Sequence, residues 1–81
     1  MYRIKLNKLD ELKEGKTNIY LESKIGYTRQ YLSEIFTGKR IVDKETAVKI
    51  LDPICSESVK LKDKLDKNGM DKVLKYFFEE I

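Results

Sequence analysis

The stretch "TNIYLESKIGYTRQYLSEIFTGKR", residues 17–40, decides the fold, because it reads as two short helices joined by almost no chain. Thr17 and Thr28 are of a residue type that caps helix N-termini, since a hydroxyl oxygen can accept a hydrogen bond from a free N–H group of the first turn. Gly26 can end the first helix, because glycine readily adopts a positive φ. Only Gly26 and Tyr27 separate the two segments, so we predict two helices that cross steeply.

The second of these helices has two unlike faces when its residues are placed at steps of about 100°. Leu32 and Ile35 form an apolar stripe that is suited to packing. The opposite arc has no apolar member and consists of Arg29, Gln30, Ser33 and Thr37. A solvated helix face is one interpretation of this arc. The other is a DNA-reading face, since arginine can pair with guanine and glutamine with adenine in the major groove.

The composition of the chain argues against several classes of function. The chain has 81 residues, no histidine and one cysteine, Cys55. An internal disulfide is therefore impossible, and the usual general base and metal ligand are missing. We expect no enzyme activity, no metal and no cofactor. Cys55 is expected to be a small buried side chain, with a redox role as the alternative.

The positive charge is concentrated in the first half of the chain. Residues 1–40 carry nine basic and five acidic side chains, whereas residues 41–81 carry eight and nine. This distribution is compatible with a polyanionic partner at one face. The N-terminal segment "MYRIKLNKLDELKEG" has no apolar run that would suit a signal peptide or a membrane span, so a cytoplasmic protein is predicted.

The N-terminal residues show two periods in succession. Tyr2, Ile4 and Leu6 alternate with charged residues, which is typical of a short strand but also fits a frayed first turn of helix. From Leu6 the apolar residues recur every three positions, at Leu9 and Leu12. We predict a helix that is capped by Asn7 and stopped by Gly15.

Three further helices are predicted in the second half. Asp43 would cap the helix "DKETAVKIL", residues 43–51, and the pair Asp52-Pro53 predicts the start of the next helix, which ends at Asn68-Gly69. The pattern i, i+3, i+4, i+7, i+8, i+11 predicts a last helix over 70–81, with the apolar positions Met70, Val73, Leu74, Phe77, Phe78 and Ile81. The predicted fold is an all-α bundle of five to six short helices, with at most one N-terminal strand. It forms a single domain over 1–81, with a core at about 6–51 and a helical extension at about 53–81.

Residues 17–40 resemble the XRE-type helix-turn-helix of the Cro and phage-repressor superfamily. "DKETAVKIL" resembles the helix that follows in that family, so the resemblance spans roughly residues 6–51. "RIKL" is similar to the N-terminal strand segment of Cro repressors, whereas the predicted helical C-terminus is not. The positions that carry the resemblance are Thr17, Leu21, Gly26, Thr28, Arg29, Leu32, Ser33, Ile35, Gly38, Lys39 and Arg40.

The resemblance implies double-stranded DNA as the partner. Asn18, Thr37 and Lys39 would bind phosphates, and Arg40 is either a further phosphate contact or a solvated charge. Thr28 would cap the recognition helix and touch the DNA backbone, and Tyr31 would be half-buried. Base edges would face Arg29, Gln30, Ser33 and Glu34. The implied DNA-binding set is Thr17, Asn18, Thr28, Arg29, Gln30, Tyr31, Ser33, Glu34, Thr37, Lys39 and Arg40.

The chain departs from the family pattern at three positions. Glu22 stands where alanine is usual at the crossing of the two helices, so either it leans into solvent or the crossing is wider. Phe36 replaces a common acidic residue, and Glu11 stands where its arginine partner is often found. We therefore expect apolar packing in place of a buried ion pair.

Phe77, Phe78 and Ile81 have two interpretations. They belong to the core, or they form the surface through which two copies dimerise. The function that we predict is that of a phage or mobile-element repressor, acting as a dimer on an operator. The alternatives are an antitoxin that binds a toxin through its C-terminal half, and an anti-defence inhibitor that keeps the fold but binds protein instead of DNA.

Overall fold

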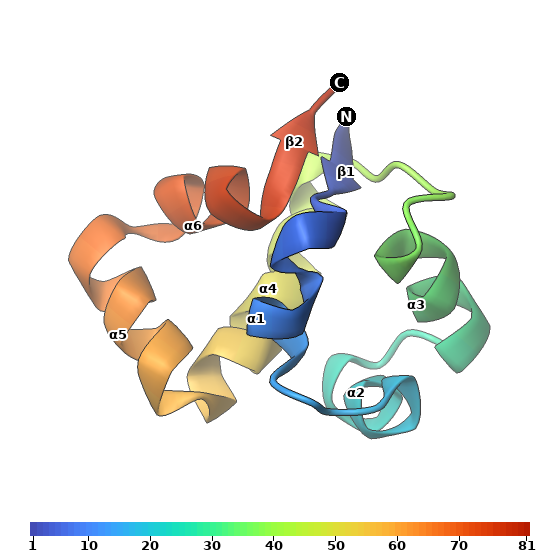
Figure 1. The fold of residues 1–81 in the computed structure, drawn as a ribbon, viewed down its shortest axis with the longest axis horizontal. Helices are drawn as coiled ribbons and strands as arrows, with labels where there is room; N and C mark the ends of the chain where they lie inside the picture. Colours follow the sequence, from blue (N-terminus) through green and yellow to red (C-terminus); the bar gives the residue numbers. More distant parts are fainter.

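Six helices and one small sheet make up the fold in the computed structural model, which describes residues 1–81 throughout (Figure 1). Figure 1 shows α2 and α3 on one side of α1 and α4, with α5 and α6 on the other side. None of the helices is long and apolar enough to cross a membrane. The elements are β1 (Tyr2–Ile4), a 3-10 turn (Leu6–Lys8), α1 (Leu9–Lys13), α2 (Asn18–Ile25), α3 (Arg29–Phe36), α4 (Lys44–Glu57), α5 (Val59–Asn68), α6 (Met70–Phe77) and β2 (Phe78–Glu80).

The predicted caps around the first two crossing helices are confirmed. The Oγ1 atom of Thr17 accepts a hydrogen bond from the Tyr20 N–H at 3.2 Å, and Thr28 accepts one from the Tyr31 N–H at 3.2 Å. Gly26 follows α2 with φ at 94°, a conformation that a side chain would strain. Together these contacts place α2 and α3 where the sequence predicts them.

The N-terminal helix differs from the prediction at both ends. The three-residue repeat of leucines begins as a 3-10 turn, which has three residues per turn, and Asn7 lies inside that turn. Lys8 precedes α1 and forms no capping hydrogen bond through its side chain. The last residue of α1 is Lys13, and the left-handed residue after it is Glu14, with φ 51°, one position before the predicted stop at Gly15.

The predicted helix start at Asp52-Pro53 is wrong, because α4 continues through Pro53 as far as Glu57. A proline inside a helix costs a backbone hydrogen bond. The buried Ile54 and Cys55 extend the apolar stripe of the same helix, and their burial favours continuation. The break comes at Ser58, whose Oγ accepts a hydrogen bond from the Leu61 N–H at 3.2 Å. Ser58 is therefore the cap of the next helix.

The last predicted helix is too long, because residues 78–80 form a strand. The backbone of Phe78 is extended, with φ −124° and ψ 147°, and β2 pairs antiparallel with β1. The register places Tyr2 opposite Glu80 and Ile4 opposite Phe78. On its other side, Tyr2 exchanges two backbone hydrogen bonds with Val42, at 2.7 and 2.8 Å. The strand interpretation of the N-terminal residues is thus confirmed, and the C-terminus supplies its partner.

The change from helix to strand also decides where the two phenylalanines lie. Phe77 and Phe78 are only 0% and 1% exposed, because the turn of the chain between them directs both side chains into the same core. Their burial confirms the core interpretation for these two residues, and neither side chain is exposed to a second copy of the chain. Ile81 remains 58% exposed. Cys55 is fully buried, and burial raises the pKa of its thiol to about 11.

Candidate nucleic-acid interface

A shallow groove runs between the N-terminus of α2 and the polar face of α3. Two helices that are separated by only three residues, Gly26 to Thr28, supply its walls. Six of its seven lining residues belong to the set predicted to bind DNA, and Ile19 is the seventh. The lining residues are Thr17, Asn18, Ile19, Arg29, Gln30, Ser33 and Glu34.

The face of α3 that borders the groove is held by the packing of the opposite face. Leu32 and Ile35 are fully buried, so the helix cannot rotate without exposing its apolar stripe. Arg29 and Gln30 lie in its first turn and are exposed. Neither side chain forms a hydrogen bond or an ion pair within the chain. Both are therefore free to donate to an external acceptor.

Glu34 is paired with Arg40, which follows α3. A guanidinium nitrogen of Arg40 lies 3.2 Å from the Oε1 atom of Glu34, and the guanidinium lies 5.0 Å from the centre of the Tyr31 ring. The carbonyl oxygen of Glu34 also accepts hydrogen bonds from the N–H groups of Lys39 and Arg40. The single acid on this face thus has a positive partner, which reduces its repulsion of a phosphate backbone.

Tyr31 is half-buried, as predicted, with its ring 5.1 Å from that of Tyr27. The hydroxyl of Thr37 already has partners within the chain. It donates within the helix end, at 2.8 Å to the carbonyl of Ser33 and 3.2 Å to that of Glu34, so its one proton is not free for a phosphate. Lys39 is exposed, and its ammonium group forms no ion pair within the chain. Of these two residues, Lys39 is thus the one that is free to meet a phosphate.

Asn18 has a partner that the sequence did not indicate. The Nζ atom of Lys13 donates to the Oδ1 atom of Asn18 at 2.7 Å. Lys13 is the last residue of α1, so it reaches the start of α2 across the short turn at residues 14–17. No periodicity or motif marks Lys13 in the sequence. The one available signal is that it is the basic residue nearest to the predicted phosphate contact on the preceding helix.

The three departures from the family pattern are explained by the structure. Glu22 is exposed and leans into solvent. Phe36 is only 2% exposed, which confirms apolar packing at that position. Glu11 accepts a hydrogen bond from the hydroxyl of Tyr76 on α6 at 2.7 Å. Its carboxylate therefore joins α1 to the C-terminal extension.

A cluster of three side chains connects α2 to the end of α4. On the side of α2 away from the groove residues, the hydroxyl of Tyr20 donates to Glu57 at 2.9 Å, and the ammonium of Lys24 lies 3.1 Å from the same carboxylate. Hydrogen bonds from Lys24 and Tyr20 lower the pKa of the Glu57 carboxyl. This cluster joins α2 to the end of α4, and it leaves the N-terminus of α2 unobstructed.

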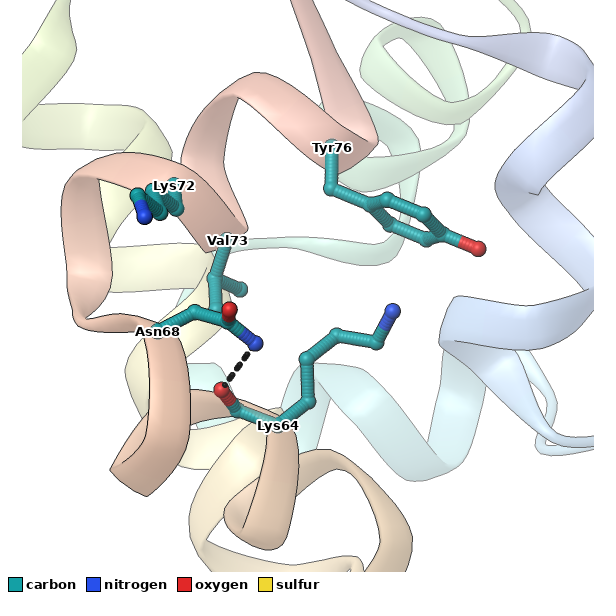
Figure 2. A pocket seen from close by; sticks show the side chains of 5 residues that line it. All are labelled: Lys64, Asn68, Lys72, Val73 and Tyr76. Atoms are coloured by element: carbon teal, nitrogen blue, oxygen red, sulfur yellow. Dashed lines mark hydrogen bonds between the residues drawn. The ribbon is translucent and has the colours of Figure 1, made fainter.

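A hollow between α5 and α6 is separate from the groove (Figure 2). Figure 2 shows the side chain of Lys64 extending toward the ring of Tyr76, and its Nζ lies 3.5 Å from the ring centre. The same ammonium lies 3.7 Å from Glu11, and the amide of Asn68 donates to the Lys64 carbonyl at 2.9 Å. The polar groups of Lys64 and Asn68 thus have partners within the chain. We therefore interpret the hollow as part of the contact between α1 and the C-terminal helices.

Comparison with families of known proteins gives one match. The helix-turn-helix family HTH_3 matches residues 10–53, which is more than half of the chain and includes α2, α3 and the whole groove. Comparisons with curated proteins and with solved structures gave no match.

Proposed function

The chain belongs to the helix-turn-helix family HTH_3 of DNA-binding transcription regulators, and we propose that it is a sequence-specific repressor of the phage or mobile-element type. The single observation that carries the proposal is the pair Arg29 and Gln30. Both are exposed and unpaired in the first turn of a helix whose other face is fully buried. Donors held in this way are suited to meet base edges, because a recognition helix presents its N-terminal residues to the major groove.

In the proposed complex, α3 lies in the major groove. Arg29 donates to O6 and N7 of guanine, and Gln30 pairs with N6 and N7 of adenine. Ser33, one turn further on, accepts or donates to either base. Glu34 is suited to accept from N4 of cytosine, and its ion pair with Arg40 holds its carboxylate beside the groove.

The phosphate contacts in this proposal come from both helices. Asn18 at the start of α2 and Lys39 after α3 bind the backbone on either side of the reading helix. Thr17 and Thr28 use their hydroxyl oxygens as caps, so each keeps a proton to donate to a phosphate. Arg40 remains beside Glu34, or exchanges that partner for a phosphate.

Repression would result from occlusion, with a dimer covering an operator that overlaps a promoter. A helix-turn-helix monomer reads few base pairs, and two half-sites about one turn apart need two copies. Exposed apolar side chains at the sheet support a dimer. Ile81 and Met1 are 58% and 52% exposed, and the N–H of Ile81 donates to the carbonyl of Met1 at 2.8 Å. Light scattering should show a dimer that Ile81→Asp converts to a monomer.

The experiment that tests the function is a selection of bound sequences from random duplexes, followed by affinity measurements over a range of salt concentrations. A dimer that neutralises about eight to twelve phosphates should give a steep plot of log K against log[salt], with a slope of about −0.9 for each phosphate. Enrichment of one half-site and a steep slope would support the proposal. No enrichment and a flat slope would contradict it and would favour the protein-binding alternatives.

A further inference from the structure

The side chain of Asn18 can present either of two opposite ends to a phosphate. Its amide oxygen only accepts hydrogen bonds, whereas its amide nitrogen donates two. A phosphate also only accepts, so it binds the nitrogen and is repelled by the oxygen. Which end is available therefore decides whether Asn18 favours or opposes DNA.

Lys13 decides this orientation. Its ammonium carries three donors and no acceptor, so the contact of 2.7 Å between Nζ and Asn18 can involve only the amide oxygen. The amide nitrogen of Asn18 is then the end that remains free. On the basis of the proposed function, we propose that Lys13 is a positioning residue for DNA binding, which orients Asn18 so that its amide nitrogen donates to a phosphate.

Two features of the fold hold Lys13 in place. It ends α1 directly before the left-handed residue Glu14, which turns the chain toward α2. Its ammonium also lies 5.5 Å from the centre of the Phe36 ring, at the end of α3, and its side chain is half-buried. A carboxylate at position 36 would compete with Asn18 for this ammonium, and the phenylalanine does not. Lys13 thus contacts both helices that form the groove.

Orientation before binding is favourable because the cost of ordering a side chain lowers affinity. An unconstrained asparagine on an exposed helix start would present its oxygen part of the time. The contact with Lys13 removes those orientations from the free protein. A direct contact between Lys13 and a phosphate would also raise affinity, but it would release one further counterion and so change the salt slope.

The test uses the whole chain and the duplex found by selection. Lys13→Met and Asn18→Ala are measured singly and together, by fluorescence anisotropy over a range of salt concentrations. Lys60→Met on α5 is the matched control, because Lys60 is exposed, forms no ion pair and carries the same charge. Arg29→Ala is measured in parallel as a marker of the reading helix. Circular dichroism melts establish that each variant is folded.

Lys13→Met and Asn18→Ala should each weaken binding by about tenfold, and the double variant should be no weaker than either single one. The salt slope of Lys13→Met should equal that of the wild type. In the free protein, the side-chain NH₂ resonances of Asn18 should shift in Lys13→Met and not in Lys60→Met.

Three outcomes would overturn the proposal. The first is a Lys13→Met variant with wild-type affinity. The second is a salt slope that is smaller by about 0.9 for each subunit, roughly 1.8 for the dimer, with effects that add to those of Asn18→Ala, since this result would show that Lys13 itself contacts a phosphate. In both cases a loss of base preference in Arg29→Ala would leave the proposed function standing. The third is a wild-type protein that binds no duplex, which would overturn the function as well.

Discussion

Replacing Arg29 with alanine should weaken operator binding without weakening the fold. In the proposed complex the guanidinium forms two hydrogen bonds with one guanine in each half-site. Its loss should cost about 1–3 kcal/mol for each half-site, which is roughly a five- to 150-fold loss of affinity per half-site. Random duplexes should be affected less, because a bidentate base contact exists only on the right sequence. The preference for guanine should relax at that one position.

The free energy of unfolding should stay within about 0.5 kcal/mol of the wild-type value, because Arg29 is exposed and has no partner in the chain. The small change in the free energy of unfolding should make the variant slightly more stable than the wild type. Arg29 begins α3, where the positive end of the helix dipole disfavours a cation, and alanine is a strong helix former. A urea titration that shows marked destabilisation would mean that Arg29 has a structural role that the fold does not reveal.

Anisotropy on the operator and on a random duplex, at two salt concentrations, measures both effects. Lys60→Ala is the control, since it removes one positive charge from an exposed position of α5 that does not line the groove. The control should leave the base preference unchanged. If Arg29→Ala also left operator affinity and base preference unchanged, α3 would not be the reading helix, and the proposed mode of recognition would be wrong.

Three further outcomes follow from burial and titration. Phe78→Ala should lower the free energy of unfolding of the monomer by about 3–5 kcal/mol in urea titrations, since Phe78 is 1% exposed. Ile81→Ser should change the same quantity, measured at concentrations where the protein is monomeric, by about 0.5 kcal/mol or less; equal effects would contradict the assigned burial. Hydrogen bonding to Thr46 holds the pKa of the Asp43 carboxyl below its usual value of 3.8, so the stability that it contributes is present above pH 3.8 and is lost as the pH falls through the lower pKa of the folded state. Asp43→Ala should therefore lower Tm at pH 7 and reduce the fall in Tm below pH 3.8, and a variant with the acid sensitivity of the wild type would disprove this assignment. Burial raises the pKa of the Cys55 thiol to about 11, so a thiol reagent at pH 8 should modify it slowly until urea unfolds the chain, and rapid modification of the native protein would show that the site is open.

The parts of the fold that could be predicted from sequence are those decided by neighbouring residues. Thr17, Thr28 and Asp43 each accept a hydrogen bond from a backbone N–H three positions later, so their types and spacing are enough to place three helix starts. The buried stripe of Leu32 and Ile35 was likewise visible as a helical period. The groove follows from these local features, because two capped helices with a short connection can lie in few ways.

The features that the sequence did not show depend on distant residues. The helical period over residues 70–81 predicts a helix to the end of that stretch. It contains no information about β1, near the N-terminus, which pairs with residues 78–80. Helix α4 continues through Pro53 because Ile54 and Cys55 are buried in the core. Local sequence patterns do not indicate this burial. The contact between Lys13 and Asn18 could not be predicted from the sequence either, because it depends on how the chain turns between α1 and α2.

The pairing of β1 with β2 has a consequence for the order in which the chain folds. It joins Tyr2 to Glu80, so it closes nearly the whole chain into one loop, whereas α2 and α3 meet across three residues. Loop closure costs about 0.6 kcal/mol more for each doubling of loop length, so the helical pair can assemble early and the strands close late. On a ribosome, β1 emerges before the other elements of this fold and stays without β2 until residues 78–80 have been synthesised. Among the elements of this fold, β1 is therefore exposed longest to proteases and to other nascent chains, although Tyr2 and Ile4 become part of the core.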